Sequence, residues 1–390
     1  MAELQQLVGS AGGVVVGTLI QERQRRDPAT LVGRGKVEEI RDLSDRSDAH
    51  LLVFDEDLSP AQQRNIEREV GRKTIDRTQL ILDIFARRAR TREGRLQVEL
   101  AQLDYILPRL SGQGILLSRL GGGIGTRGPG ETKLETDRRR IRQRIQAVRR
   151  EIDRVRRGRR TRREARGRGS APVVAMVGYT NAGKSTLFNA LTAAGTPVAD
   201  ALFMTLDPLV RRARLGPGCD VLLVDTVGFI QKLPHGLVAA FRATLEEVVE
   251  ADLLVHVIDA SADDLEARED AVHAVLDEIG ASRRPVLEVL NKIDRVGEPR
   301  RRALAGGRPD AALVSAVSGE GTEALRRQIS SRLALSPRSV KLRFNAEDAR
   351  GIAAVYGSGR VTSHEVDGDQ VTLHAEIPER LLSRYVENLV

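Results

Sequence analysis

The feature that most constrains this chain is a loop from Gly178 to Ser185, which fits the pattern G-x-x-x-x-G-K-[ST]. An apolar run, Val173–Val177, precedes the loop, and a helical pattern, Thr186–Leu191, follows it. A glycine-rich loop between a strand and a helix wraps phosphate groups with its backbone N–H groups. Chance is the alternative, and composition alone gives such a match in roughly 1% of chains of this length. The loop therefore predicts a nucleotide-binding α/β domain.

Two side chains of this loop would carry its chemistry. We expect Lys184 to reach the β- and γ-phosphates and the hydroxyl of Ser185 to bind Mg²⁺. The candidate nucleotide-contacting residues of the segment are Gly178, Tyr179, Thr180, Asn181, Ala182, Gly183, Lys184, Ser185 and Thr186.

A second motif, Asp225-Thr-Val-Gly228, follows the apolar run Val221–Val224 and begins 41 residues after Lys184. The carboxylate of Asp225 can hold Mg²⁺ through water, and the N–H of Gly228 can sense the γ-phosphate. Thr205 lies between the two motifs and is the candidate switch residue that closes over Mg²⁺. Taken alone, the motif is a common turn and Thr205 an ordinary loop threonine. The predicted Mg²⁺ ligands are Ser185, Thr205 and Asp225, and the residues predicted to act in hydrolysis are Lys184, Thr205, Gly228 and Asn181.

A third group of residues would read the base. Asn291-Lys292-Ile-Asp294 follows another apolar run, 66 residues after Asp225. A carboxylate at Asp294 can accept hydrogen bonds from both N1–H and N2–H₂ of guanine, which adenine cannot match. Ser315 and Ala316, after the last apolar run, are placed to supply a backbone N–H to guanine O6. Each piece alone could be a turn, but the whole set in this order predicts GTP or GDP with Mg²⁺.

The rest of the chain predicts parts on both sides of this GTPase domain, which we place at 170–336 with a doubly wound, mostly parallel sheet. Residues 1–84 are expected to form a small α/β subdomain, and residues 337–390 a small α+β domain. The expected strands are Val14–Ile20, Leu51–Phe54, Val173–Val177, Val221–Val224, Leu253–Ile258, Val286–Leu290, Ala312–Val314, Lys341–Phe344, Val361–Val366 and Gln370–Glu376. The expected helices outside the hairpin described next are Gly35–Leu43, Ser59–Val70, Thr186–Leu191, Ala346–Tyr356 and Pro378–Leu389.

Residues 85–169 predict a long antiparallel helical hairpin, because apolar residues recur at spacings of three and four. One seam comprises Phe85, Ala89, Leu96, Leu100, Leu103, Leu107 and Leu110, and the other Leu134, Ile141, Ile145, Val148, Ile152 and Val155. Between the seams, residues 111–130 hold eight glycines and predict an irregular tip. The second arm, Thr132–Gly169, has 17 Lys and Arg against 5 Asp and Glu, a net charge of +12. Its end, Gly158–Gly169, is expected to be a frayed basic linker.

Composition narrows the class of protein. The net charge of +8 indicates a nucleic-acid partner, although a GC-rich genome also explains the excess of 55 arginines over seven lysines. Aromatic residues are only 3%, which argues against readers that stack single-stranded bases. The single Cys219 excludes an intramolecular disulfide. No apolar run approaches the ~20 residues of a membrane helix, and no secretory signal begins at Met1, so a soluble cytoplasmic protein is expected.

The sequence closely resembles the HflX-type translational GTPases of bacteria across nearly its whole length. The most specific stretch is Gly121-Gly-Gly-Ile-Gly125-Thr-Arg-Gly-Pro-Gly130-Glu131-Thr-Lys-Leu-Glu135-Thr-Asp137-Arg138-Arg139. The resemblance implies a factor that binds the large ribosomal subunit, places the glycine-rich tip near the peptidyl-transferase centre of the 23S-type rRNA, and splits stalled or stressed ribosomes. Family members carry another strand before the position of Leu7, so either this strand is absent here or the chain begins at an internal start.

Several alternatives stay open beside this resemblance. A ribosome-assembly GTPase of the related Obg class is one, and an RNA-binding scaffold that only senses nucleotide is another. The basic arm could bind rRNA phosphates through Arg138, Arg139, Arg140, Arg142 and Arg144, or could be only a solvated coiled-coil face. We expect a monomer in the cytoplasm, with the membrane periphery as a second location.

Two positions bear on the mechanism of hydrolysis. Many small GTPases orient water with a Gln directly after D-x-x-G, but this chain has Phe229 there, so slow intrinsic hydrolysis that the ribosome stimulates is expected. GTPases of the tRNA-modifying and iron-transport classes use an Asn at the place of Asn181 to hold K⁺, whereas Asn181 could instead only suit the tight turn. Gly33-Arg-Gly35-Lys36 fails the phosphate-loop template and predicts a turn before a helix rather than an ATP site.

Overall fold

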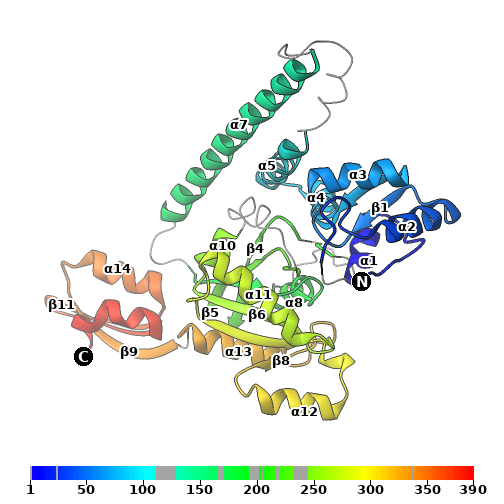
Figure 1. Ribbon diagram of the computed structural model, residues 1–390. Coiled ribbons are helices and arrows are strands. Elements are labelled where there is room, and N and C mark those ends of the chain that lie inside the picture. Colours follow the sequence, from blue (N-terminus) through cyan, green and yellow to red (C-terminus); the bar gives the residue numbers. More distant parts are fainter. Residues whose placement is uncertain are drawn as a thin grey trace. The chain divides into compact units, whose positions relative to one another are not determined.

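The computed structural model describes residues 2–22, 25–110, 129–165, 171–192, 202–203, 205–216, 219–231, 245–335 and 337–390. They fall into two compact units (Figure 1). The first contains the described residues of Met1–Gly158 and of Ala201–Asp207. The second contains those of Arg159–Asp200, Pro208–Lys232 and Ala243–Val390. Ala201–Asp207 therefore belongs to the first unit, although the chain on either side of it belongs to the second.

The first unit begins with a small α/β fold. Its parallel sheet pairs β1 (Leu51–Phe54) with β2 (Lys73–Asp76), from Leu51 opposite Lys73 to Phe54 opposite Asp76. Its helices are α1 (Ala2–Ser10), α2 (Arg34–Arg46), α3 (Pro60–Val70) and α4 (Arg77–Arg88). The predicted start of α3 is confirmed, because Ser59 accepts from the N–H of Gln62 at 3.2 Å while the Gln62 side chain accepts from the N–H of Ser59 at 2.9 Å.

The expected strand Val14–Ile20 is wrong. This segment is not part of a strand, and the side chains of Val14, Val16 and Ile20 are 85%, 56% and 64% exposed. An apolar run becomes a strand only where a partner edge binds its backbone, and a local pattern cannot reveal that edge. The turn predicted at Gly33–Lys36 is close to the structure, in which Gly33 is the N-cap of α2.

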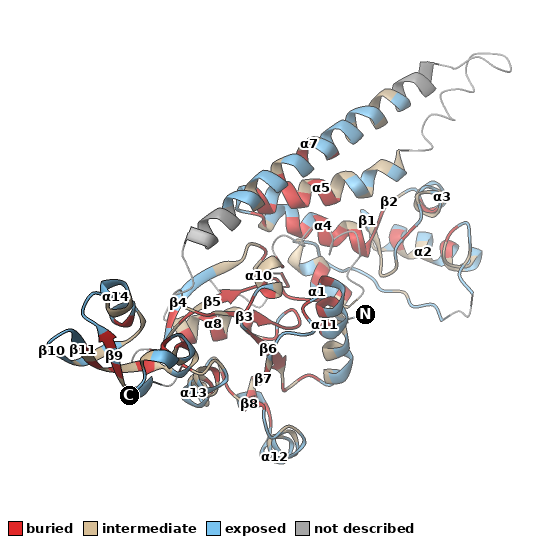
Figure 2. Ribbon diagram, turned by 90° about the vertical axis from the view of Figure 1, so that its left-hand side faces the viewer, coloured by how far each residue is buried: buried red, intermediate tan, exposed pale blue. Residues whose placement is uncertain are grey.

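The helical hairpin is confirmed, with α5 (Arg92–Arg109) and α7 (Pro129–Ala165) as its arms. Ion pairs join Arg92 to Glu151 at 3.0 Å and Arg144 to Glu99 at 2.6 Å, so the arms run antiparallel. Among the described side chains of α7, those of Ile145, Val148 and Ile152 are buried. Most of the rest of this helix is exposed or half-buried (Figure 2).

Both ends of the expected hairpin need correction. The first arm begins at Arg92 rather than near Phe85, because α4 ends at Arg88 and Thr91 caps a new helix by accepting from the N–H of Gly94 at 3.0 Å. The expected linker from Gly158 is helical as far as Ala165. Of the predicted glycine-rich tip, residues 111–128 lie outside the described residues, as do 166–170 of the linker.

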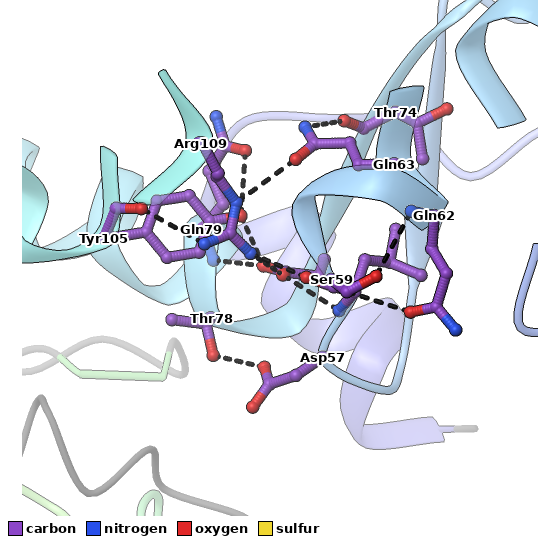
Figure 3. A network of polar contacts seen from close by, with 11 residues as sticks. Asp57, Ser59, Gln62, Gln63, Thr74, Thr78, Gln79, Tyr105 and Arg109 are labelled. Carbon is purple, nitrogen blue, oxygen red and sulfur yellow. Dashed lines mark hydrogen bonds and ion pairs between the residues drawn. The ribbon is translucent and has the colours of Figure 1, made fainter. Parts of the chain in front are cut away.

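A network of hydrogen bonds connects the C-terminal end of α5 with the sheet of β1 and β2 (Figure 3). At its centre is the buried carboxylate of Asp76, which accepts from the hydroxyl of Tyr105 at 3.0 Å and from the guanidinium of Arg109 at 2.9 Å. The same carboxylate accepts from the N–H groups of Leu58 at 3.2 Å and Gln79 at 2.8 Å. Burial and the charge of Asp76 raise the pKa of Tyr105, so its hydroxyl stays a donor.

The second unit contains a six-stranded sheet in the order β4-β5-β3-β6-β7-β8. The strands are β3 (Val173–Val177), β4 (Leu209–Gly216), β5 (Cys219–Asp225), β6 (Leu253–Asp259), β7 (Val286–Asn291) and β8 (Ala312–Leu313). The five predicted strands are present and parallel, and β4 is an unpredicted antiparallel edge strand.

Helices cover both faces of this sheet. The core on one face joins Val255 and Val257 of β6 to α8 (Lys184–Thr192) and α13 (Thr322–Arg332). Between those two valines, His256 points to the opposite face, where its ring lies 5.6 Å from that of His273 in α11 (Leu265–Ile279). The remaining helices are α10 (Glu246–Val249), η1 (Ile293–Arg295) and α12 (Glu298–Gly307). The predicted doubly wound, mostly parallel sheet is thus confirmed.

The chain ends in a three-stranded antiparallel sheet of order β10-β11-β9, with its own core. The elements are β9 (Pro337–Asn345), α14 (Ala349–Ser358), β10 (Arg360–Asp367), β11 (Gln370–Pro378) and η2 (Glu379–Asn388). The last helix is of the 3₁₀ type, whereas an ordinary helix was expected there. Within the described part of the chain, we find no helix with the length and apolarity needed to cross a membrane.

Candidate functional site

The loop between β3 and α8 has the backbone that its glycines permit. Gly178 has φ +146°, and a Cβ there would lie 2.3 Å from the carbonyl oxygen of Val257. Gly183 has φ +91°, and a Cβ there would lie 2.2 Å from the side-chain nitrogen of Asn291. No other residue fits either position, so both glycines are needed for the loop to pass this close to β6 and β7.

Lys184, the first residue of α8, is buried under this loop. Its Nζ donates to the carbonyl oxygens of Gly178 at 3.0 Å and Tyr179 at 2.8 Å. Burial lowers the pKa of Lys184 to about 8; the charge of Lys292 lowers it further, and that of Asp225 opposes the shift. A phosphate placed in the loop would restore the full charge of this amine.

The shifted pKa of Lys184 predicts pH-dependent nucleotide binding. Below pH 8 the amine is already charged, but above pH 8 the free protein must take up a proton before it binds phosphate. The dissociation constant for a fluorescent GDP should therefore rise by about tenfold between pH 7 and pH 9. Fluorescence titrations below the pH at which guanine ionises would measure this rise. Lys184→Arg, which stays charged, should bind more weakly but without the pH dependence, and a flat wild-type profile would contradict the assignment.

Ser185 and Asp225, two of the predicted Mg²⁺ ligands, lie in contact with each other. The hydroxyl of Ser185 donates to the carboxylate of Asp225 at 2.6 Å. Mg²⁺ prefers such oxygen ligands and takes its remaining ones from phosphates and water, so the pair fits this ion. The described residues include no group of three His, Cys, Asp or Glu side chains that could hold a metal alone. Thr205, the third predicted ligand, belongs to the first unit.

The segment after Asp225 is held against the phosphate loop. A Cβ on Gly228 would lie 2.9 Å from the Nζ of Lys184 and 2.8 Å from the Cα of Thr180. Phe229 is buried, its N–H donates to the carbonyl of Gly178 at 3.1 Å, and its carbonyl accepts from the N–H of Thr180 at 2.7 Å. An apolar side chain fixed in this way has no atom that can orient a water.

The residues predicted to read the base are connected through Asn291. Its amide donates to the carbonyl of Ala182 at 2.9 Å and accepts from the N–H of Ala316 at 3.0 Å, which joins two of the predicted segments. The N–H of Ser315 donates to Glu320 at 2.9 Å. Asp294, in η1, is exposed, and its carboxylate therefore remains open to a base.

Asp259, at the end of β6, contacts a predicted motif residue, and we did not predict this contact. It pairs with Lys292 at 2.7 Å and accepts from the hydroxyl of Ser261 at 2.6 Å. Although burial raises the pKa of Asp259, the hydrogen bonds from Lys292 and Ser261 lower it overall. Its place at the carboxyl end of a predicted parallel strand, where sites of such sheets gather, was the available signal.

A phosphate loop and a carboxylate predicted to read the base, both at the carboxyl ends of one parallel sheet, are typical of the class of P-loop GTPases. In agreement, the family model described as "50S ribosome-binding GTPase" matches residues 173–292. The models "GTP-binding GTPase N-terminal" and "GTP-binding GTPase Middle Region" match residues 1–86 and 88–166. Curated relatives that are 44–46% identical over nearly the whole chain are named GTPase HflX, and the chain belongs to the HflX family of GTPases, which hydrolyse GTP.

The similarity covers almost the whole chain. GTPase HflX of Alkalihalophilus pseudofirmus is 45% identical over 98% of this chain and 92% of its own length. GTPase HflX of Escherichia coli is 44% identical over 97% of this chain and 89% of its own. Among solved structures, a GTP-binding protein of Sulfolobus solfataricus in complex with GDP is 26% identical, covers 85% of this chain and 94% of its own, and has a TM-score of 0.45.

Proposed function

We propose that this GTPase acts on the ribosome: it binds the large subunit through rRNA near the peptidyl-transferase centre and splits stalled or stressed ribosomes. The description of the family model that matches its GTPase domain names 50S binding. The observation that carries the proposal for this chain is a stripe of arginines on α7. We further propose that it works as a monomer in the cytoplasm, with Mg²⁺ held by Ser185, Asp225 and, in the GTP state, Thr205.

The arginine stripe consists of Arg139, Arg142, Arg150 and Arg154, all exposed. On an ideal helix these residues lie within about 120° of one another, opposite the buried Ile145, Val148 and Ile152. None of the four pairs with a carboxylate among the described residues. Of the other arginines that we expected to bind rRNA, Arg140 pairs with Asp137 and Arg144 with Glu99. Four guanidinium groups on one helix face can bind the phosphates of structured RNA.

Sucrose-gradient sedimentation tests the proposal directly. With a non-hydrolysable GTP analogue, the protein should sediment with the large subunit and convert 70S ribosomes to subunits, and GDP should support neither. Replacing the four stripe arginines by glutamine should lower the affinity at least about tenfold at moderate salt. Replacing Arg283, Arg284, Arg327 and Arg332, which are exposed in the second unit, changes the net charge equally and should have little effect.

The outcome also separates the alternative functions. Binding to large-subunit precursors without splitting of mature ribosomes would indicate a ribosome-assembly GTPase. Binding without multiple-turnover hydrolysis would indicate a nucleotide-sensing scaffold. If the stripe variant and the wild type sediment equally with the large subunit, the arginine stripe is not part of the binding surface.

We propose that hydrolysis by the isolated protein is slow and that the large subunit stimulates it, because Phe229 cannot orient water. We also propose that Asn181 holds K⁺ against the phosphates. Asn181 is exposed and has φ +60°, a conformation that also suits a mere turn residue.

The variant Asn181→Gly separates these two roles, because glycine keeps the backbone conformation but removes the amide. Hydrolysis should be faster in K⁺ than in Na⁺ for the wild type and equal for Asn181→Gly, in assays with and without large subunits. If the wild type hydrolyses GTP at equal rates in K⁺ and Na⁺, Asn181 serves only the turn and does not hold K⁺. A fast rate without subunits that does not rise on their addition would contradict the role of Phe229.

A further inference from the structure

Among the described residues, Leu202, Phe203 and Thr205–Asp207 come from the sequence of the GTPase domain but belong to the first unit. Leu202, Phe203 and Leu206 are buried. The ring of Phe203 meets that of Phe85 of α4 edge to face, with centroids 4.7 Å apart, and the N–H of Leu202 donates to the hydroxyl of Ser10 at 3.2 Å. Phe203 holds this position with φ +57°, in the left-handed region that costs a side chain energy. The segment is therefore docked and not a loose loop.

The carboxylate of Asp207 contacts the residues at the start of α5. Its carboxylate accepts from the N–H groups of Arg90 and Thr91, each at 2.9 Å, and from the hydroxyl of Thr91. Thr91 is itself the N-cap of α5. A negative charge at this place satisfies backbone donors that a helix start leaves open and interacts favourably with the helix dipole.

Gly94 in the first turn of α5 allows this approach. A Cβ on Gly94 would lie 2.2 Å from an oxygen of Asp207. Gly94 does not have a positive φ, so the helix backbone itself would accept alanine there. The glycine is needed for the contact with Asp207 and not for the helix.

We propose that Asp207 is a positioning residue that latches the segment of Thr205 onto α5 when no γ-phosphate is bound. This inference rests on the switch role proposed for Thr205. In this proposal the place of Thr205 beside Mg²⁺ and the γ-phosphate lies farther from the present position of Asp207 than the roughly 7 Å that two residues can span, so Thr205 reaches it only when Asp207 leaves Thr91. The start of α5, the first arm of the hairpin, then loses its carboxylate cap. Binding of GTP and release of this cap are therefore coupled, and each favours the other.

The ratio of the affinities for a GTP analogue and for GDP tests the latch. Asp207→Ala removes it, so the affinity for a non-hydrolysable GTP analogue relative to GDP should rise about three- to thirtyfold. Gly94→Ala should expel the carboxylate and change this ratio in the same direction, although alanine strengthens the helix. A variant that only damaged the fold would not show both results. Asp57→Ala is the matched control, because Asp57 also accepts from a threonine hydroxyl, that of Thr78, in the same unit.

Hydrogen exchange tests the latch by a measurement that does not depend on nucleotide affinities. In the wild type, the amides of Arg90 and Thr91 should exchange faster with the GTP analogue than with GDP, and in Asp207→Ala they should exchange fast with both. An unchanged ratio in Asp207→Ala and Gly94→Ala, or equal exchange in both wild-type states, would overturn the latch. Thr205→Ala should weaken binding of the analogue alone; if it does not, the switch role of Thr205 fails, which is a different result from an unchanged ratio in Asp207→Ala.

Discussion

Replacing Asp294 by asparagine is expected to weaken GTP binding at least about 10²-fold, because two hydrogen bonds from guanine to a charged acceptor are lost. The same variant should gain affinity for xanthosine triphosphate. Xanthine presents a carbonyl where guanine has its amino group, and an amide can donate to that carbonyl while it accepts from N1–H. Competition titrations against fluorescent GDP, with both triphosphates, measure the two changes.

The control for this substitution is Asp277→Asn, which removes an equally exposed carboxylate at the end of α11 and should leave both affinities unchanged. If GTP binding is lost and binding of the xanthine nucleotide does not improve, Asp294 stabilises η1 and does not contact the base. Retention of GTP binding would show that another group reads the base.

Removal of the Asp76 carboxylate should have the largest effect on stability. Asp76→Ala removes the buried carboxylate that accepts from the guanidinium of Arg109, from the hydroxyl of Tyr105 and from two backbone N–H groups. Arg109 and Tyr105 keep other acceptors, but the ion pair is lost. Loss of one partner of a buried ion pair costs about 3–5 kcal/mol. Urea unfolding followed by circular dichroism should show a lower midpoint for the first unit, and α5 should exchange hydrogen faster.

An exposed carboxylate of the same unit serves as its control. Asp42→Ala, in α2, should change the free energy of unfolding by less than about 0.5 kcal/mol. If Asp76→Ala unfolds at the wild-type urea concentration, the network of Figure 3 does not hold α5 to the sheet.

The sequence predicts the second unit well because local signals and tertiary structure agree there. The five parallel strands are continuous apolar runs, and the site residues follow strand ends at motif spacings. The edge strand β4 carries three arginines in Leu209–Gly216 and is half exposed, so its sequence lacks the apolar signature of a strand. In the first unit, β2 is only four residues long and contains Lys73 and Asp76, while the apolar Val14–Ile20 is unpaired.

Long-range contacts also limit how much of the candidate site can be predicted from the sequence. The motifs indicate that Lys184, Ser185 and Asp225 act together, since each has a fixed place in a strand–loop–helix unit. They give no sign that Asp207 contacts Thr91, 116 residues earlier, or that Lys184 folds back on two carbonyls. Such contacts depend on packing, which no spacing rule encodes.

The docking of Leu202–Asp207 with the first unit has a consequence for how this molecule can be divided. A fragment cut at the sequence boundaries of the GTPase domain would keep Phe203 and Asp207 but lose Phe85 and the start of α5, their partners. With the latch proposed above, kinetic constants of such a fragment would belong to an enzyme with an altered nucleotide preference.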